Sequence, residues 1–104
     1  MYYIYVIRCS DNSLYTGVTT DFNKRFSEHS TKSPLAAKYT KSRQAVGVEA
    51  LWTAPDRSLA QKLEYRIKRL SKMQKEELIK NPNLLEEYMK EKLDISQYKY
   101  IKDF

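Results

Sequence analysis

Residues 2–19, YYIYVIRCSDNSLYTGVT, contain two runs that are rich in β-branched and aromatic residues, Tyr2 to Arg8 and Leu14 to Thr19. Such runs are typical of β-strands. Between them lies a cluster of turn formers, Ser10-Asp11-Asn12-Ser13. A short connection of this kind joins antiparallel strands. The stretch therefore predicts a β-hairpin, around which the rest of the fold is arranged.

The register of this hairpin decides which side chains share a face of the sheet. A three-residue loop that ends at Asn12 places this residue in the left-handed conformation that asparagine tolerates, and it pairs Tyr5 with Gly17. Because side chains alternate between faces, Tyr5 and Tyr15 then lie on the same face. A two-residue turn would put the two tyrosines on opposite faces. We expect the three-residue loop.

The rest of the chain shows helix caps, helical periodicity and one further strand pattern. Asp21 is a suitable N-cap, and Ser71 with Gln74 forms a capping-box pattern. The expected elements are a helix to about Ser30, a polar and basic loop over residues 31–45, a strand from Val46 to Thr53, helices from about Arg57 to Leu70, from Ser71 to Lys80 and from Leu84 to Leu93, and a tail from Ile95 to Phe104.

This order predicts an α+β fold, a small three-stranded antiparallel sheet flanked by helices in the order ββαβαα. A length of 104 residues suits one domain. No stretch approaches the ~20 apolar residues of a membrane span, and no signal-peptide pattern begins the chain. Cys9 stands alone, which excludes a disulfide framework or a thiolate metal site within one chain. We expect a soluble, cytoplasmic monomer that does not associate with membranes.

The net charge of +6 is distributed unevenly. Residues 1–71 carry 12 Lys and Arg against 6 Asp and Glu, whereas residues 72–104 carry 7 of each kind. An asymmetric basic region is typical of proteins that bind phosphate backbones, although it also serves simply to solubilise a surface. The candidate nucleic-acid contacts are the basic residues Lys24, Lys38, Lys41 and Arg43.

The helix after Asp21 has charged residues on its inward side. At 100° per residue, Phe22 and Phe26 share the arc that packs on the core, and Arg25 and His29 lie on or beside that arc. A guanidinium in such a place needs an anion. The ordinary interpretations are an Arg25 stem that extends past the core edge and a hydrogen-bonded His29 at that edge.

Glu64 flanks the apolar stripe of the helix that begins near Arg57. Its ordinary interpretation is a surface salt bridge with Lys68, four residues later. A carboxylate at a core edge near a basic region is also what a metal ion that bridges a phosphate would need.

These residues form an ordered set. Tyr3-Ile4-Tyr5, Tyr15-Thr16-Gly17, Arg25, His29 and Glu64, at their spacings, resemble the motifs of the GIY-YIG nuclease superfamily. The resemblance is nearest to the small, free-standing bacterial branch with a UvrC/intron-endonuclease-type domain. It covers roughly residues 2–80, so it implies a nuclease-like domain over residues 1–80 and a C-terminal extension over residues 81–104.

The resemblance implies a role for each matched residue. One of Tyr5 and Tyr15 helps to deprotonate the attacking water, with Tyr5 the first choice. Arg25 contacts the scissile phosphate, His29 matches a position held by His or Tyr, and Glu64 is the carboxylate that holds one Mg²⁺ or Mn²⁺ ion.

The sequence departs from the family pattern at two positions. Tyr3 replaces the glycine that names the first motif, and Val18 follows Gly17 where some relatives have a lysine. Gly17 beside Tyr5 should leave space for a phosphate to approach the backbone.

The function implied by the resemblance is that of a metal-dependent endonuclease, acting on DNA in repair or recombination. Two alternatives stay open. One is a nucleic-acid-binding module of the same fold that cuts poorly. The other is a protein-interaction domain that uses residues 84–104, in which case the basic region only solubilises.

Overall fold

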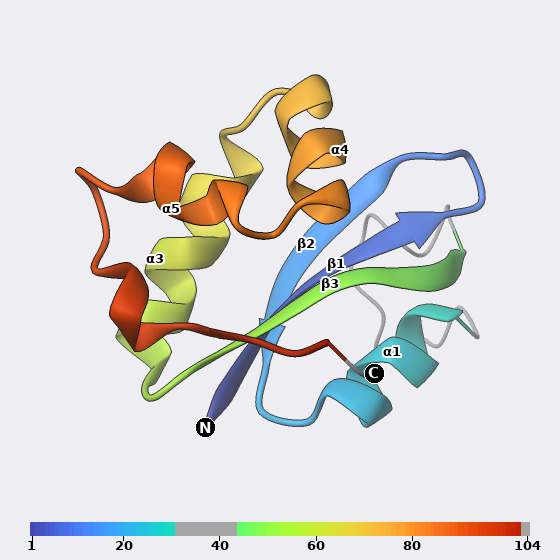
Figure 1. Ribbon diagram of the computed structural model, residues 1–104. Helices are drawn as coiled ribbons and strands as arrows, with labels where there is room; N and C mark the ends of the chain where they lie inside the picture. The colour runs from blue at the N-terminus through green and yellow to red at the C-terminus, as the bar shows by residue number, and fades with distance from the viewer. Residues whose placement is uncertain (31–43, 103–104) are drawn as a thin grey trace.

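The computed structural model describes residues 1–30 and 44–102. Its centre is an antiparallel sheet with the strand order β2-β1-β3-β4, in which β1, β2 and β3 are labelled in Figure 1. The strands are β1 (Tyr2–Cys9), β2 (Leu14–Thr19), β3 (Ala45–Ala54) and β4 (Lys99–Tyr100). The helices are α1 (Phe22–Ser30), α3 (Arg57–Lys68), α4 (Lys72–Lys80), α5 (Leu84–Met89) and the 3₁₀-helix η1 (Ile95–Gln97). The α+β class is confirmed.

The hairpin has the register expected from its loop. Tyr5 pairs with Gly17 and Ile7 pairs with Tyr15. Asn12 has a φ of 69°, and it is the one non-glycine residue with a positive φ among those described. The Asn12 amide donates to the Cys9 carbonyl, which closes the loop. The three-residue loop is therefore confirmed, and it fixes which face every hairpin side chain occupies.

The sheet has four strands, and the expectation of three was wrong. The tail forms β4, in which Tyr100 pairs with Trp52 and Lys99 with Thr53 of β3. The Tyr100 ring also meets the Trp52 ring edge-on, with centroids 5.5 Å apart. A strand of two residues is too short to show alternation in its sequence. It forms because it pairs with a strand that is distant in the sequence, and a local pattern does not reveal such a contact.

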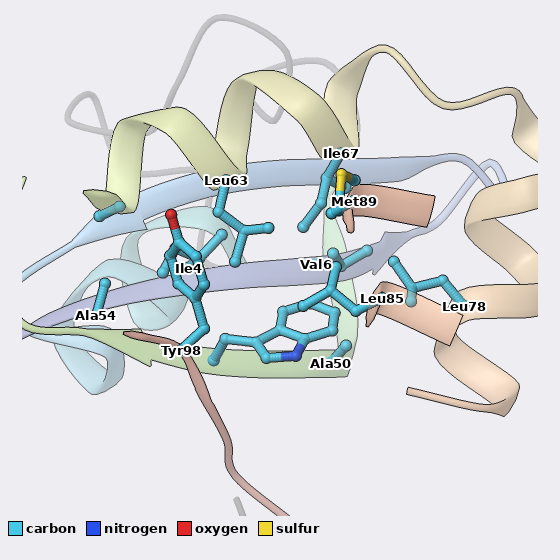
Figure 2. Packing of buried hydrophobic residues seen from close by; sticks show 12 residues of the cluster. Ile4, Val6, Ala50, Ala54, Leu63, Ile67, Leu78, Leu85, Met89 and Tyr98 are labelled. Atoms are coloured by element: carbon cyan, nitrogen blue, oxygen red, sulfur yellow. The ribbon is translucent and has the colours of Figure 1, made fainter. Parts of the chain in front are cut away.

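The helices lie on both faces of the sheet, with α1 on one side and α3, α4 and α5 on the other (Figure 1). Leu63 and Ile67 of α3 pack on Ile4 and Val6 of β1 in the main core (Figure 2). The opposite face has a smaller cluster around Tyr5 and Ile7, and Phe22 and Phe26 of α1 cover it. Alternation along β1 therefore separates two cores, one of them aromatic.

The caps predicted from the sequence are present. The Asp21 side chain accepts from the Lys24 amide at the start of α1, and Ser71 and Gln74 form the capping box of α4. α5 ends at Met89, short of the expected Leu93, and a turn follows in which the Lys92 and Leu93 amides both donate to the Met89 carbonyl. No helix within the described ranges is long and apolar enough to cross a membrane.

The tail residue Tyr98 joins the C-terminal segment to α3. Its side chain is buried in the main core, and its hydroxyl donates to the Leu59 carbonyl at 2.7 Å. We expect Tyr98→Phe to lower the free energy of unfolding by about 1 kcal/mol, because a buried hydrogen bond is lost. Urea denaturation measures this. Tyr88→Phe, which removes an exposed bond to Glu77, is the control. Equal losses in both variants would contradict the role of Tyr98.

Candidate active site

Tyr5 lies at the centre of the aromatic face. It comes from the middle of β1, and 1% of its surface is exposed. Its ring centroid is 6.3 Å from that of Tyr15 and 5.7 Å from that of Phe22. Strand β1 thus supplies a buried phenol, and the neighbouring strand and helix supply rings on either side of it.

Arg25 reaches this phenol from α1. Phe22 and Phe26 of the same helix are stacked, with centroids 5.9 Å apart, and they pack on the sheet. This orientation lets the Arg25 guanidinium donate a hydrogen bond to the Tyr5 hydroxyl. Nη1 of Arg25 also donates to Oε1 of Glu28 at 2.9 Å, and the Arg25 side chain remains 26% exposed. The inward arc of the helix therefore brings a cation to the phenol, while part of the guanidinium stays accessible.

The surroundings of Tyr5 shift its acidity in opposite directions. Burial raises the pKa of Tyr5 well above its ordinary value, and the neighbouring Tyr15 raises it further. The hydrogen bond and the charge of Arg25 lower this pKa, whereas the charge of Glu64 raises it. Burial is the largest cause, so the Tyr5 hydroxyl stays protonated in the folded protein at neutral pH.

Glu64 approaches the same group of side chains from α3, on the other face of the sheet. Its side chain is 24% exposed, and Oε2 lies 3.3 Å from Nζ of Lys68. That Nζ also lies 5.7 Å from the ring centroid of Tyr15. Since β2 is an edge strand, the flank of α3 can meet Tyr15 around the edge of the sheet. The ordinary ion pair of Glu64 is present, and it lies beside Tyr15.

Gly17 serves a different purpose from the one expected. A Cβ atom built on Gly17 would overlap the hydroxyl oxygen and Cζ of Tyr5. The space beside this glycine is therefore filled by the Tyr5 ring, and the expected space for a phosphate is absent there. The physical reason is the register, because Tyr5 pairs directly with Gly17 and residues opposite each other on one face are neighbours.

The comparisons with known proteins agree with this arrangement. The family model of the GIY-YIG catalytic domain matches residues 1–77. The chain belongs to the GIY-YIG family. A curated relative, the UPF0213 protein FN1575 of Fusobacterium nucleatum, is 45% identical over 82 residues, which cover 79% of this chain and 80% of that protein. The UPF0213 protein DP2720 of Desulfotalea psychrophila is 43% identical over 76% of this chain and 71% of its own length.

One solved structure is similar in sequence. The solution NMR structure of the UPF0213 protein BH0048 from Bacillus halodurans is 38% identical and has a TM-score of 0.49, with 77% of this chain and 84% of that chain covered. The UPF0213 relatives are small, free-standing members of the GIY-YIG family.

The remaining candidate residues of this family member are only partly described. His29 lies in the last turn of α1, and its side chain is outside the described part. Lys24 is exposed on α1. Lys38, Lys41 and Arg43 lie outside the described residues. The structure therefore brings together four of the five expected catalytic residues, namely Tyr5, Tyr15, Arg25 and Glu64. The Lys68 partner expected for Glu64 is present, and the structure adds Glu28 as the partner of Arg25, which its spacing of three residues could have indicated.

The carboxylates available for a metal ion are few. Among the residues that the structure describes, no three His, Cys, Asp or Glu side chains are grouped so that they could hold one. Glu64 is partly exposed, and its charge acts on Tyr5. Such a donor fits an ion that takes most of its ligands from water and from a substrate phosphate, as Mg²⁺ commonly does.

The packing of Tyr5 on Gly17 gives a direct test. We expect Gly17→Ala to lower the free energy of unfolding by about 1–3 kcal/mol, because the Tyr5 ring must move. Gly47→Ala is the matched control, since no heavy atom lies within 4 Å of a Cβ there. A strand alanine should be neutral or slightly stabilising at Gly47. Urea denaturation of both variants checks this, and a Gly17→Ala protein of normal stability would disprove the packing.

The raised pKa of Tyr5 predicts a loss of stability in alkali. The pKa of Tyr5 in the folded state exceeds the unfolded value of 10.0. The contribution of Tyr5 to the free energy of unfolding is therefore complete below pH 10 and is lost as the pH rises towards the folded-state pKa. Above about pH 10 the free energy of unfolding should fall less steeply in Tyr5→Phe than in the wild type, by up to about 1.4 kcal/mol per pH unit. Urea denaturation at a series of pH values measures this, and identical slopes of the free energy of unfolding against pH in the two proteins would contradict the raised pKa of Tyr5.

Proposed function

We propose that this protein is a divalent-metal-dependent endonuclease that hydrolyses phosphodiester bonds in DNA, as part of repair or recombination. One observation carries the proposal. A guanidinium, two phenols and a carboxylate from α1, β1, β2 and α3 lie together, with Arg25 hydrogen-bonded to Tyr5. Phosphodiester hydrolysis needs an activated water and positive charge at the phosphoryl oxygens, and these groups can supply both.

Arg25 is the group that would bind the scissile phosphate. Its planar guanidinium presents five N–H donors as a rigid fork that matches the oxygens of a phosphate. A phosphate would take the accessible side of the guanidinium in competition with Glu28, by paired hydrogen bonds. Tyr5 would hold Arg25 in position, which suits a buried phenol that stays protonated.

Tyr15 is the better candidate for the general base. It is partly exposed, whereas the Tyr5 hydroxyl is enclosed by Gly17 and Arg25. The ammonium of Lys68 lies 5.7 Å from the centroid of the Tyr15 ring, so a positive charge stands beside this phenol. Burial of Tyr5 disfavours its anion and so argues against our first choice of base. Tyr15 would take the proton of the attacking water.

Glu64 is the group that would hold the metal ion. Bound by Glu64, water and the substrate, a Mg²⁺ or Mn²⁺ ion would supply Lewis-acid stabilisation of the phosphoryl charge. Lys68 would give up its ion pair with Glu64 and stay near Tyr15. An exposed pair of this kind is weak, so its loss costs little.

The proposal that residues 84–104 form a protein-interaction surface receives less support. Leu85, Met89 and Tyr98 are buried in the main core, so they are not free to bind a partner. The tail also completes the sheet through β4. Its packing favours a structural role for this segment.

The metal role of Glu64 is tested by substitution. We expect Glu64→Gln to lower Mg²⁺- or Mn²⁺-dependent nicking of DNA about a hundredfold or more, because the carboxylate ligand is lost at nearly unchanged volume. DNA affinity measured without metal should not fall, since a negative charge near phosphate is removed. Glu86→Gln, on the exposed side of α5, is the matched control. Near-normal metal-dependent nicking by Glu64→Gln would end the metal role of this residue.

A further inference from the structure

A groove runs along the flank of α3 that is remote from β2. It consists of two adjoining hollows of about 570 and 230 Å³, which share Arg66 and Lys92 in their linings. One side of the groove is α3, and the other is formed by α5 and the residues that follow it. We call it the α3–α5 groove. Its combined size suits a segment of ligand rather than a single ion.

The α3–α5 groove is strongly basic. Lys62, Arg66, Arg69 and Lys92 line it, and no ion pair joins any of these four to an acid within residues 1–30 and 44–102. The acidic residue in the lining is Asp94, whose carboxylate accepts hydrogen bonds from Ser96 and Gln97. Four cations against one engaged carboxylate favour an anionic ligand.

An exposed aromatic ring lies among these cations. Tyr65 is 54% exposed and also lines the groove. The guanidinium carbons of Arg66 and Arg69 lie 5.5 and 5.4 Å from its ring centroid, and Nη1 of Arg69 donates to its hydroxyl at 3.3 Å. The two arginines thus hold the ring in place on the helix surface. An accessible ring flanked by cations is the arrangement on which a nucleic-acid base stacks while its phosphates meet the cations.

The α3–α5 groove is separate from the candidate active site. Arg66 lies two residues after Glu64, about 200° around the helix, so α3 itself stands between them. Lys68 and Tyr65 occupy the helix surface that connects the two regions. A strand bound at the active site could therefore continue over α3 into the groove.

We propose that the α3–α5 groove binds an unpaired strand of the nucleic acid, beyond the phosphate that is cut, with a base stacked on Tyr65. This inference rests on the proposed function and names a feature of its substrate, a single-stranded segment. The strand must be unpaired because a base in a duplex has its faces covered by its neighbours. An acidic peptide could pair with the cations, but it would gain nothing from the ring.

The charge of the groove is tested with a single-stranded oligonucleotide of about ten residues, bound to the full chain in metal-free buffer. Arg66→Ala with Arg69→Ala should weaken binding about tenfold or more and lower the salt slope by about 1.4, since each phosphate contact contributes about 0.7. Lys80→Ala with Lys99→Ala removes the same charge from exposed sites outside the groove and should bind as the wild type does. Equal losses in the two double variants would overturn the inference.

The ring is tested separately. Tyr65→Ala should weaken binding of the oligonucleotide about tenfold, which is about 1.4 kcal/mol, whereas Tyr65→Phe keeps the stacking surface and should retain affinity. Normal binding by Tyr65→Ala would overturn the proposal, and so would competition by polyglutamate as effective as that by the oligonucleotide. Because no metal is present, binding does not depend on cleavage. If the groove variants weaken binding but the protein never nicks DNA, the proposed nuclease function is refuted and this inference stands. If the protein nicks DNA but the groove variants bind normally, this inference is refuted and the nuclease function stands.

Discussion

The Tyr5 ring lies across the backbone of Gly17, and the rest of the site depends on that contact. Any larger residue at position 17 would meet the ring, and a one-residue slip of the hairpin register would put Tyr5 and Tyr15 on opposite faces. The positive φ of Asn12 sets that register from a distance. One turn residue and one glycine therefore place a phenol in the aromatic core, where Arg25 can donate to it.

The site forms at the edge of the sheet, beside β2, where side chains from its two faces can meet. α1 packs on the aromatic face through Phe22 and Phe26, and α3 packs on the opposite face through Leu63 and Ile67. Neither helix could reach the other through the sheet. The polar flank of α3 instead extends past the edge strand β2, where Lys68 meets Tyr15. Core packing on both faces thus determines the position of the polar residues between them.

Local patterns in the sequence were sufficient to predict the hairpin loop, the caps of α1 and α4 and the inward position of Arg25, because each depends on a few neighbouring residues. Long-range contacts were not visible in this way. β4 is held by pairing with a strand about fifty residues away, and the close fit of Tyr5 on Gly17 depends on how one ring fills space. The use of Gly17 was misjudged for that reason.

The charged groups of the site are already neutralised before any substrate binds. Arg25 pairs with Glu28 and Glu64 pairs with Lys68, each within one turn of its own helix. Partly exposed pairs at such spacings contribute little stability, about 0–1 kcal/mol. In the proposed reaction a phosphate would therefore displace Glu28, and a metal ion would displace Lys68, at small cost.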